Sequence, residues 1–253
     1  MRTVGLKIAL VVGLVLFIGI SQASHAQVTK PAPPTPIDKK KVELGGTPWD
    51  PEWDLIIEKA LPPEMLSSQV PKGVHQFCPR FYEMNETDKR AFWAYFFQAL
   101  AGAEASLEPT ATVRHTKSAV AQRDEVTGKA RRSQGLLQLA YADQKRYGCD
   151  FDWEADRARK MDDPVNNVLQ PKNNLECGVK ILFNQIITQH KPLLAPSGYW
   201  EALHPTGPSH RIFVKEMTNP PAACGLATRS PIDKAATTKS VQEEAKQGSG
   251  AQK

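Results

Sequence analysis

The pattern of apolar positions along the chain predicts a mostly helical fold. Residues 90–104 are apolar over most of the circumference of a helix, which is typical of a helix at the centre of a domain. Residues 85–88 offer a helix cap and first-turn acids directly before it. Alternating strand patterns are scarce, so we expect a mostly α domain with long irregular loops and a small β element at most. Further helices are expected over 53–61, 136–147 and 174–190.

The first 26 residues have the pattern of a secretory signal. Arg2 and Lys7 precede an apolar and glycine run of 13 residues at 8–20, and Ser24-His25-Ala26 forms a small-x-small cleavage site. A membrane-spanning helix needs roughly 20 apolar residues, so an uncleaved anchor is the weaker alternative. No other segment is apolar enough to span a membrane. We therefore expect an exported protein, periplasmic or secreted, with no stable membrane span.

Composition divides the remaining chain into three parts. Residues 27–47 are rich in proline and lysine and are typical of an extended linker. Residues 227–253 contain almost no large apolar side chains and are typical of a tail. The predicted domain covers 48–226.

Composition and charge exclude two classes of protein. Apolar residues make up 41% of the chain and charged residues 23%, which is enough to build a core and excludes wholesale disorder. The formal net charge is +5, and loss of the signal's two basic residues leaves +3. This bias is too weak for a nucleic-acid binder, although it is compatible with an anionic substrate. We find no phosphate-binding loop or H-E-x-x-H motif and expect no cofactor.

The four cysteines lie after the signal, and none forms a C-x-x-C pair. In an exported protein this even number predicts two disulfides. Four cysteines allow three pairings, among which sequence alone does not choose. We favour Cys149–Cys177, which closes the shorter, turn-rich segment and leaves Cys78–Cys224 to connect the two ends of the domain. No histidine lies at ligand spacing from a cysteine, so we expect no metal site.

Glu104 is the candidate for chemistry. It ends the most apolar helix, and helical steps place Leu100, Phe97 and Trp93 on its face. Partial removal from water raises the pKa of a carboxyl, as a general acid requires near neutral pH. Pro109 follows closely, so the chain is expected to leave the helix near Glu104 and open a cleft there. The alternative is a frayed helix end with the carboxylate in solvent.

A second candidate is the segment from Ser133 to Leu139, in which Gly135 is expected to open a helix and Gln138 to lie one turn inside it. Glycine allows close approach of the backbone. A glutamine amide both donates and accepts, which suits a sugar hydroxyl or N-acetyl group. Ser133, Gly135 and Gln138 are therefore candidate substrate contacts. The plainer alternative is a turn followed by a helix with apolar leucines.

Four segments match a set of family motifs in order. Residues 104–109 (EASLEP) match the family motif Glu-Ser-x-hydrophobic-x-Pro, and residues 135–138 (GLLQ) match the motif Gly-Leu-Met-Gln. Asp163-Pro164 together with residues 174–182 match the motif Asp-Pro…Asn-hydrophobic-x-x-Gly…Leu. Tyr199 matches a tyrosine that the family has late in the domain. Together they resemble the soluble lytic transglycosylase domain, a single lysozyme-like domain, over about residues 90–203.

The resemblance implies an enzyme that acts on peptidoglycan glycan strands. Members of this family cleave the β-1,4 bond between N-acetylmuramic acid and N-acetylglucosamine and leave a 1,6-anhydromuramyl end. By resemblance, Glu104 is the single catalytic residue, first an acid and then a base, and Gln138 and Tyr199 contact the sugar or Glu104. One carboxyl can do both tasks because they fall in successive steps. We expect a monomer.

Three departures from the motifs leave alternatives open. Residue 105 is Ala where the family has Ser, and Trp200 replaces an asparagine, so that Trp200 either packs in the core or stacks on a sugar. The polar insert 114–132 carries Asp124 and Glu125, and a loop carboxylate could position a water. The alternatives are therefore a hydrolytic muramidase or an inactive wall-binding protein on the same scaffold.

Overall fold

The computed structural model describes residues 48–114 and 123–225. The predicted signal at 1–26, the linker at 27–47 and the tail at 227–253 lie outside these ranges. Within them, no helix has the length and apolar character needed to cross a bilayer.

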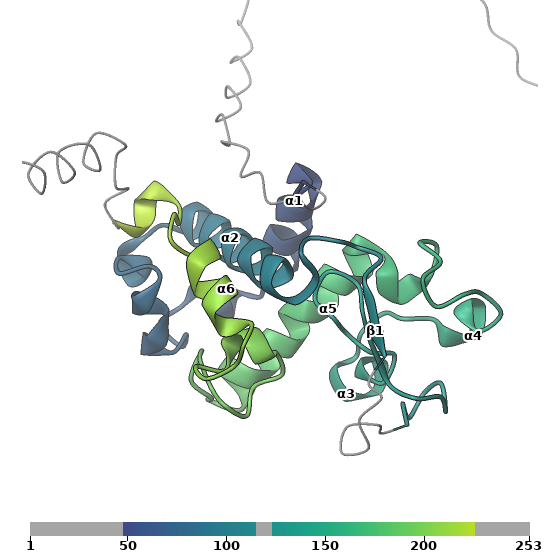
Figure 1. The fold of residues 1–253 in the computed structure, drawn as a ribbon. Coiled ribbons are helices and arrows are strands. Elements are labelled where there is room, and N and C mark those ends of the chain that lie inside the picture. The colour runs from purple at the N-terminus through teal and green to yellow at the C-terminus, as the bar shows by residue number, and fades with distance from the viewer. Residues whose placement is uncertain (1–47, 115–122, 226–253) are drawn as a thin grey trace, which may run out of the picture. The chain divides into compact units, whose positions relative to one another are not determined.

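The described chain is mostly α, as the sequence predicts (Figure 1). The α-helices are α1 (Pro51–Ala60), α2 (Glu86–Ala105), α3 (Asp143–Tyr147), α4 (Trp153–Asp156), α5 (Pro171–Phe183) and α6 (His210–Glu216). Short 3-10 turns cover Pro63–Leu66, Lys72–Gln76, Phe81–Glu83, Asn167–Leu169, Glu201–Leu203 and Ala222–Cys224, and Asn184–Thr188 forms a π-helical turn after α5. The strands are β1 (Thr112–Arg114) and β2 (Arg132–Gln134).

Helix α2 forms the centre of the core. The side chain of Asn85 accepts a 2.9 Å hydrogen bond from the backbone N–H of Asp88 and so caps the first turn. The phenylalanine and tryptophan side chains along the helix, among them Trp93 and Phe97, are fully buried and make edge-to-face ring contacts with one another, while Tyr95 is half-buried. Helix α2 packs against α1 and α6, while α1 also packs against α5 (Figure 1). The apolar pattern therefore predicted both the helix and its central place.

The helix predicted over 136–147 is wrong in its first half, because only α3 is helical. Gly135 and Gln138 adopt left-handed backbone conformations, with φ of 75° and 51°, which a helix cannot contain. Side chains from elsewhere bind the backbone instead. Leu137 N–H donates to Asn174 Oδ1 (2.8 Å), and Ala142 N–H donates to Asp124 Oδ2 (2.9 Å). These tertiary hydrogen bonds replace the intrahelical ones that the pattern of leucines suggested.

The other two predicted helices are confirmed with shifted bounds. Asp50 caps α1, since its side chain accepts a 2.9 Å hydrogen bond from Glu52 N–H. The helix expected over 174–190 begins earlier, at Pro171, a residue suited to the first turn, and ends in the π-helical turn.

The small β element is a two-stranded antiparallel sheet in which Val113 pairs with Ser133. It follows the C-terminal end of α2, on the side of α3 and α4 in Figure 1. The backbone N–H of Gly135 donates to Ala111 O at 2.8 Å and extends the pairing by one step.

Both favoured disulfides are confirmed. Cys149–Cys177 joins the segment after α3 to α5, and Cys78–Cys224 joins residues 146 positions apart at the two ends of the domain. All four cysteines are buried, and no free cysteine remains. Two disulfides are consistent with a secreted protein.

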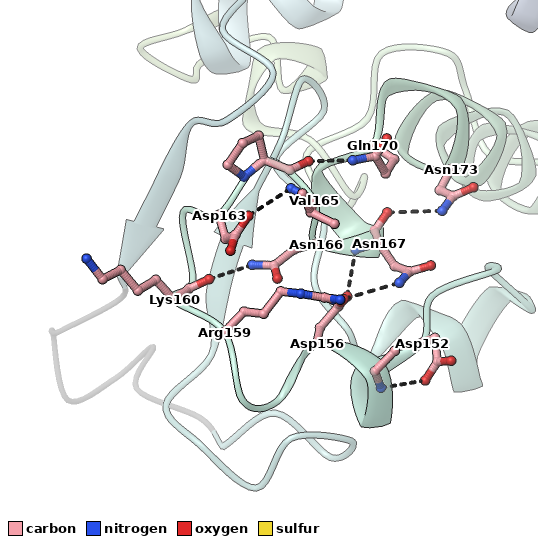
Figure 2. A network of polar contacts seen from close by, with 12 residues as sticks. Asp152, Asp156, Arg159, Lys160, Asp163, Val165, Asn166, Asn167, Gln170 and Asn173 are labelled. Carbon is pink, nitrogen blue, oxygen red and sulfur yellow. Dashed lines mark hydrogen bonds and ion pairs between the residues drawn. The ribbon is translucent and has the colours of Figure 1, made fainter.

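A polar network around Asp156 fixes the long loop between α4 and α5 (Figure 2). The buried Asp156 carboxylate pairs with Arg159 at 2.7 Å and accepts from the backbone N–H of Asn167 at 2.6 Å. The Tyr141 hydroxyl donates to the same carboxylate at 2.7 Å. The segment Asp163-Pro164 lies in this loop, where the Asp163 side chain closes a turn rather than reaching another element.

Candidate functional site

Glu104 lies in the last turn of α2, where the chain turns sharply. Ser106 and Leu107 follow with φ of 51° and 63°, two consecutive non-glycine residues in the left-handed region. Such conformations persist only where the surroundings hold them. Here, Leu107 is buried and its N–H donates to Ala101 O at 3.3 Å. The expected exit from the helix near Glu104 is therefore confirmed.

The Glu104 carboxylate faces the 3-10 turn Glu201–Leu203. Its Oε1 accepts a 2.9 Å hydrogen bond from the backbone N–H of Ala202, a fully buried residue. The opposite side of that residue is also held, because His210 Nδ1 donates to the carbonyl oxygen of Ala202 at 2.8 Å. The amide that meets Glu104 is thus fixed from two directions.

Burial raises the pKa of Glu104 above its ordinary value of 4.5. The hydrogen bond from Ala202 lowers it in part, the negative charge of Glu201 raises it, and His204 lowers it. Since desolvation is the largest of these influences, the carboxyl holds its proton to a higher pH than an exposed glutamate does. Glu104 is half-buried and bound to the protein, so it does not match the alternative of a frayed end in solvent. This environment suits a general acid.

Gly135 and Gln138 have structural roles. Gln138 is buried, and its side-chain Nε2 donates to the carbonyl oxygens of Gly135 (2.9 Å) and Ala111 (3.4 Å). Gly135 lies against Asn174, so a Cβ at this position would come within 2.4 Å of Asn174 Nδ2. These contacts are to the chain's own backbone and to Asn174. The substrate roles expected for the two residues stay predictions.

The predicted late tyrosine belongs to a polar cluster of its own. The hydroxyl of Tyr199 donates to Oδ2 of Asp143, which also accepts from Ala140 N–H at 2.8 Å. Asp143 is fully buried, and its Oδ1 has no hydrogen-bond partner among the described residues. Burial raises the pKa of Asp143, against the lowering effect of the Tyr199 hydroxyl. Burial and the neighbouring Asp143 hold the pKa of Tyr199 well above its ordinary value.

The remaining candidate residues belong neither to the surroundings of Glu104 nor to the cluster of Tyr199 and Asp143. Ser133 lies in β2, paired with Val113. Asp124 is buried, and Val126, Thr127 and Ala142 donate backbone hydrogen bonds to it. The exposed Glu125 pairs with Arg146 at 2.6 Å. Both insert carboxylates are therefore engaged within the protein, while positions 115–122 of the insert lie outside the described residues.

Trp200, whose role the sequence left open, and Trp153 are both packed inside the protein. Trp200 is 2% exposed, and its ring N–H donates to Leu137 O at 2.8 Å, which places it in the core. Trp153 is also buried, against the ring of Tyr141.

Sequence reasoning missed Asp143 and the amide of Ala202. A signal for Asp143 was present, because it is a lone carboxylate at the end of the apolar run 136–142. A backbone amide gives no such signal, since every residue except proline carries one.

Comparison with known proteins supports the fold. No family model matches the chain, and no curated protein matches it in sequence. Among solved structures, wild-type DslA (Bd0314) of Bdellovibrio matches with a TM-score of 0.51 and 20% identity, over 68% of this chain and 91% of that one. Two glutamate-to-glutamine mutants of DslA match at the same TM-score and coverage, with 18% and 19% identity. At this identity the likeness shows the fold alone, and that fold is lysozyme-like.

Proposed function

We propose that this protein is a peptidoglycan lytic transglycosylase, with Glu104 as its single catalytic residue. The observation that carries the proposal is the half-buried Glu104 carboxyl at the end of α2, whose pKa burial raises. The lysozyme-like fold and the order of the sequence motifs support it, and the two disulfides fit export to the wall.

In the proposed reaction, protonated Glu104 gives its proton to the glycosidic oxygen between N-acetylmuramic acid and N-acetylglucosamine. The bond from the muramic C1 to that oxygen breaks, and the substrate's own N-acetyl group stabilises the cationic sugar. The ionised Glu104 then takes the proton of the C6 hydroxyl as its oxygen bonds to C1 and closes the anhydro ring. The Ala202 N–H, 2.9 Å from Oε1, stabilises the carboxylate between the two steps.

Digestion of purified sacculi tests this proposal. We expect soluble muropeptides with anhydro ends, which mass spectrometry separates from reducing ends by the mass of one water. Glu104→Gln should release none while keeping its circular dichroism spectrum. Glu83→Gln is the matched control, because Glu83 is exposed and pairs only with Arg80 among the described residues. Reducing ends would identify a hydrolytic muramidase. Binding without release by the parent protein would identify an inactive wall-binding protein.

A further inference from the structure

A hollow is formed by the hairpin 123–134 and the loop after α4. It has a volume of about 270 Å³, and Glu104 is not among its lining residues. Lys129, Arg132 and Gln134 line it from the hairpin, and Tyr141 and Met161 line it from the other elements.

Hydrogen bonds fix both walls of this hollow. The side-chain Nε2 of Gln134 donates to Met161 O at 3.3 Å and so connects β2 to the loop. The loop is held in turn by Asn166, whose side chain donates to Lys160 O at 2.7 Å (Figure 2). The Tyr141 hydroxyl is bound to Asp156. The pocket is therefore built by buried polar contacts and does not depend on exposed side chains alone.

The charges that line the pocket favour an anion. Lys129 Nζ lies 4.7 Å from the centroid of the Trp153 ring, and Arg132 is half-buried in β2. Within residues 48–114 and 123–225, neither cation pairs with a carboxylate. The lining carboxylate, Asp124, already accepts three backbone N–H bonds. Two cations without carboxylate partners among the described residues thus line the same pocket, which favours an anionic group as its occupant.

We propose that this pocket binds a carboxylate of the peptide that branches from peptidoglycan strands. The identity of the peptide rests on the proposed function, whereas the preference for a carboxylate rests on Lys129 and Arg132. A guanidinium binds a carboxylate through two parallel hydrogen bonds, and an ammonium adds a third donor. The volume is below the roughly 300–1,000 Å³ of pockets that enclose whole ligands, so the pocket suits the end group of a peptide.

Binding measured by NMR tests the proposal without reference to lysis. The probe is the tetrapeptide L-Ala-γ-D-Glu-L-Lys-D-Ala, compared with the same peptide with every carboxylate amidated and with glutarate. The readout is the indole N–H of Trp153, assigned with Trp153→Phe, because Lys129 lies against this ring. We expect a saturable shift with the tetrapeptide, and affinity lower by about tenfold or more for the amidated peptide and for glutarate.

Variants assign the binding to the two cations. The double variant Lys129→Gln/Arg132→Gln should bind the tetrapeptide about tenfold more weakly or worse. Lys59→Gln/Lys72→Gln removes the same charge from exposed positions outside the pocket and should bind as the parent does. If the double variant does not fold, the single variant Lys129→Gln is measured instead. It is chosen because the Lys129 ammonium lies against the face of the Trp153 ring, whose indole N–H is the readout.

Three outcomes overturn the proposal. They are equal binding of the free and amidated peptides, equal loss in the control double variant, and glutarate binding as tightly as the tetrapeptide. Glu104→Gln should bind the tetrapeptide as the parent does. A Glu104→Gln variant that still digests sacculi would therefore refute the proposed catalytic residue and leave the result on the pocket unchanged.

Discussion

The backbone N–H of Ala202 donates a 2.9 Å hydrogen bond to Oε1 of Glu104, although 98 positions separate the two residues. This bond fastens the end of α2 to the turn before α6. It stabilises the ionised carboxyl, while burial of the same group favours the protonated form. Burial has the larger effect, so Glu104 keeps its proton more firmly than an exposed glutamate.

The first prediction concerns stability. A carboxyl whose pKa is raised by folding stabilises the fold below its unfolded pKa, and this contribution is lost as the pH rises through its folded pKa. Glu104→Gln keeps an acceptor for Ala202 N–H but cannot ionise. We therefore expect the variant to be more stable than the parent at neutral pH, and the gain to disappear below the ordinary value of 4.5. Urea denaturation across this pH range measures the difference.

Glu83→Gln serves as the control for this effect. Its exposed ion pair with Arg80 contributes little, about 0–1 kcal/mol. A Glu104→Gln variant that is less stable than the parent at neutral pH would contradict the dominance of burial.

The second prediction concerns the pH dependence of lysis and rests on the proposed function. The acid step needs protonated Glu104, so the alkaline limb of kcat/KM should have its midpoint above 4.5. The charge of Glu201 raises the pKa of Glu104 and His204 lowers it. Glu201→Gln should therefore move the limb to lower pH, and His204→Gln to higher pH. Shifts in the same direction would show that these residues act on the site through its shape rather than through charge.

The sequence predicted the features that depend on local periodicity and on the number of cysteines. The apolar face of α2 and its Asn85 cap are local signals. The even cysteine count predicted two disulfides, and the length of chain between the cysteines favoured, without deciding, the pairing that the structure has. The place of Glu104 at the helix end followed as well, since Pro109 lies just beyond it.

The segment 135–142 was not predictable in the same way. Its conformation depends on Asn174, which lies 37 positions from Leu137 and binds its backbone. Likewise, Tyr199 is bound to Asp143 across 56 positions. A local sequence pattern does not identify partners that lie so far along the chain. These partners nevertheless determine which of the predicted side chains are hydrogen-bonded within the protein.

The third prediction concerns the turn at Gly135. Gly135→Ala places a Cβ within 2.4 Å of Asn174 Nδ2, at a φ of 75° that disfavours side chains. We expect a loss of roughly 2–4 kcal/mol, from left-handed strain together with disruption of buried hydrogen bonds. Gly128→Ala is the matched control, with a φ of 65° and no heavy atom within 4 Å of the added Cβ. It should lose only about 1 kcal/mol. Denaturant titrations measure the free energy of unfolding of both variants. Equal losses would mean that the contact with Asn174 adds nothing to the cost of Gly135→Ala.

The fourth prediction concerns the buried pair of Tyr199 and Asp143. Tyr199→Phe removes a donor from a carboxylate that is already desolvated, so the pKa of Asp143 should rise further. The loss of stability, about 1–3 kcal/mol at neutral pH, should shrink in acid, where Asp143 is protonated. Tyr82→Phe loses a hydrogen bond to the neutral Val70 carbonyl, and its cost should not change over the same pH range. Parallel pH dependence in both variants would contradict the role of Asp143.

The last prediction compares the two disulfides. Cys149–Cys177 closes a separation of 28 residues and Cys78–Cys224 one of 146, and all four cysteines are buried. Since substitution by alanine removes similar buried atoms at each site, the difference between the two double variants reflects mainly the freedom gained by the unfolded chain. Loop-closure entropy assigns roughly 3.5 kcal/mol to the shorter loop and roughly 5 kcal/mol to the longer. Cys78→Ala/Cys224→Ala should therefore unfold at lower urea concentration than Cys149→Ala/Cys177→Ala. The reverse order would mean that the shorter disulfide, which joins the segment after α3 to α5, stabilises the native packing beyond its effect on the unfolded chain.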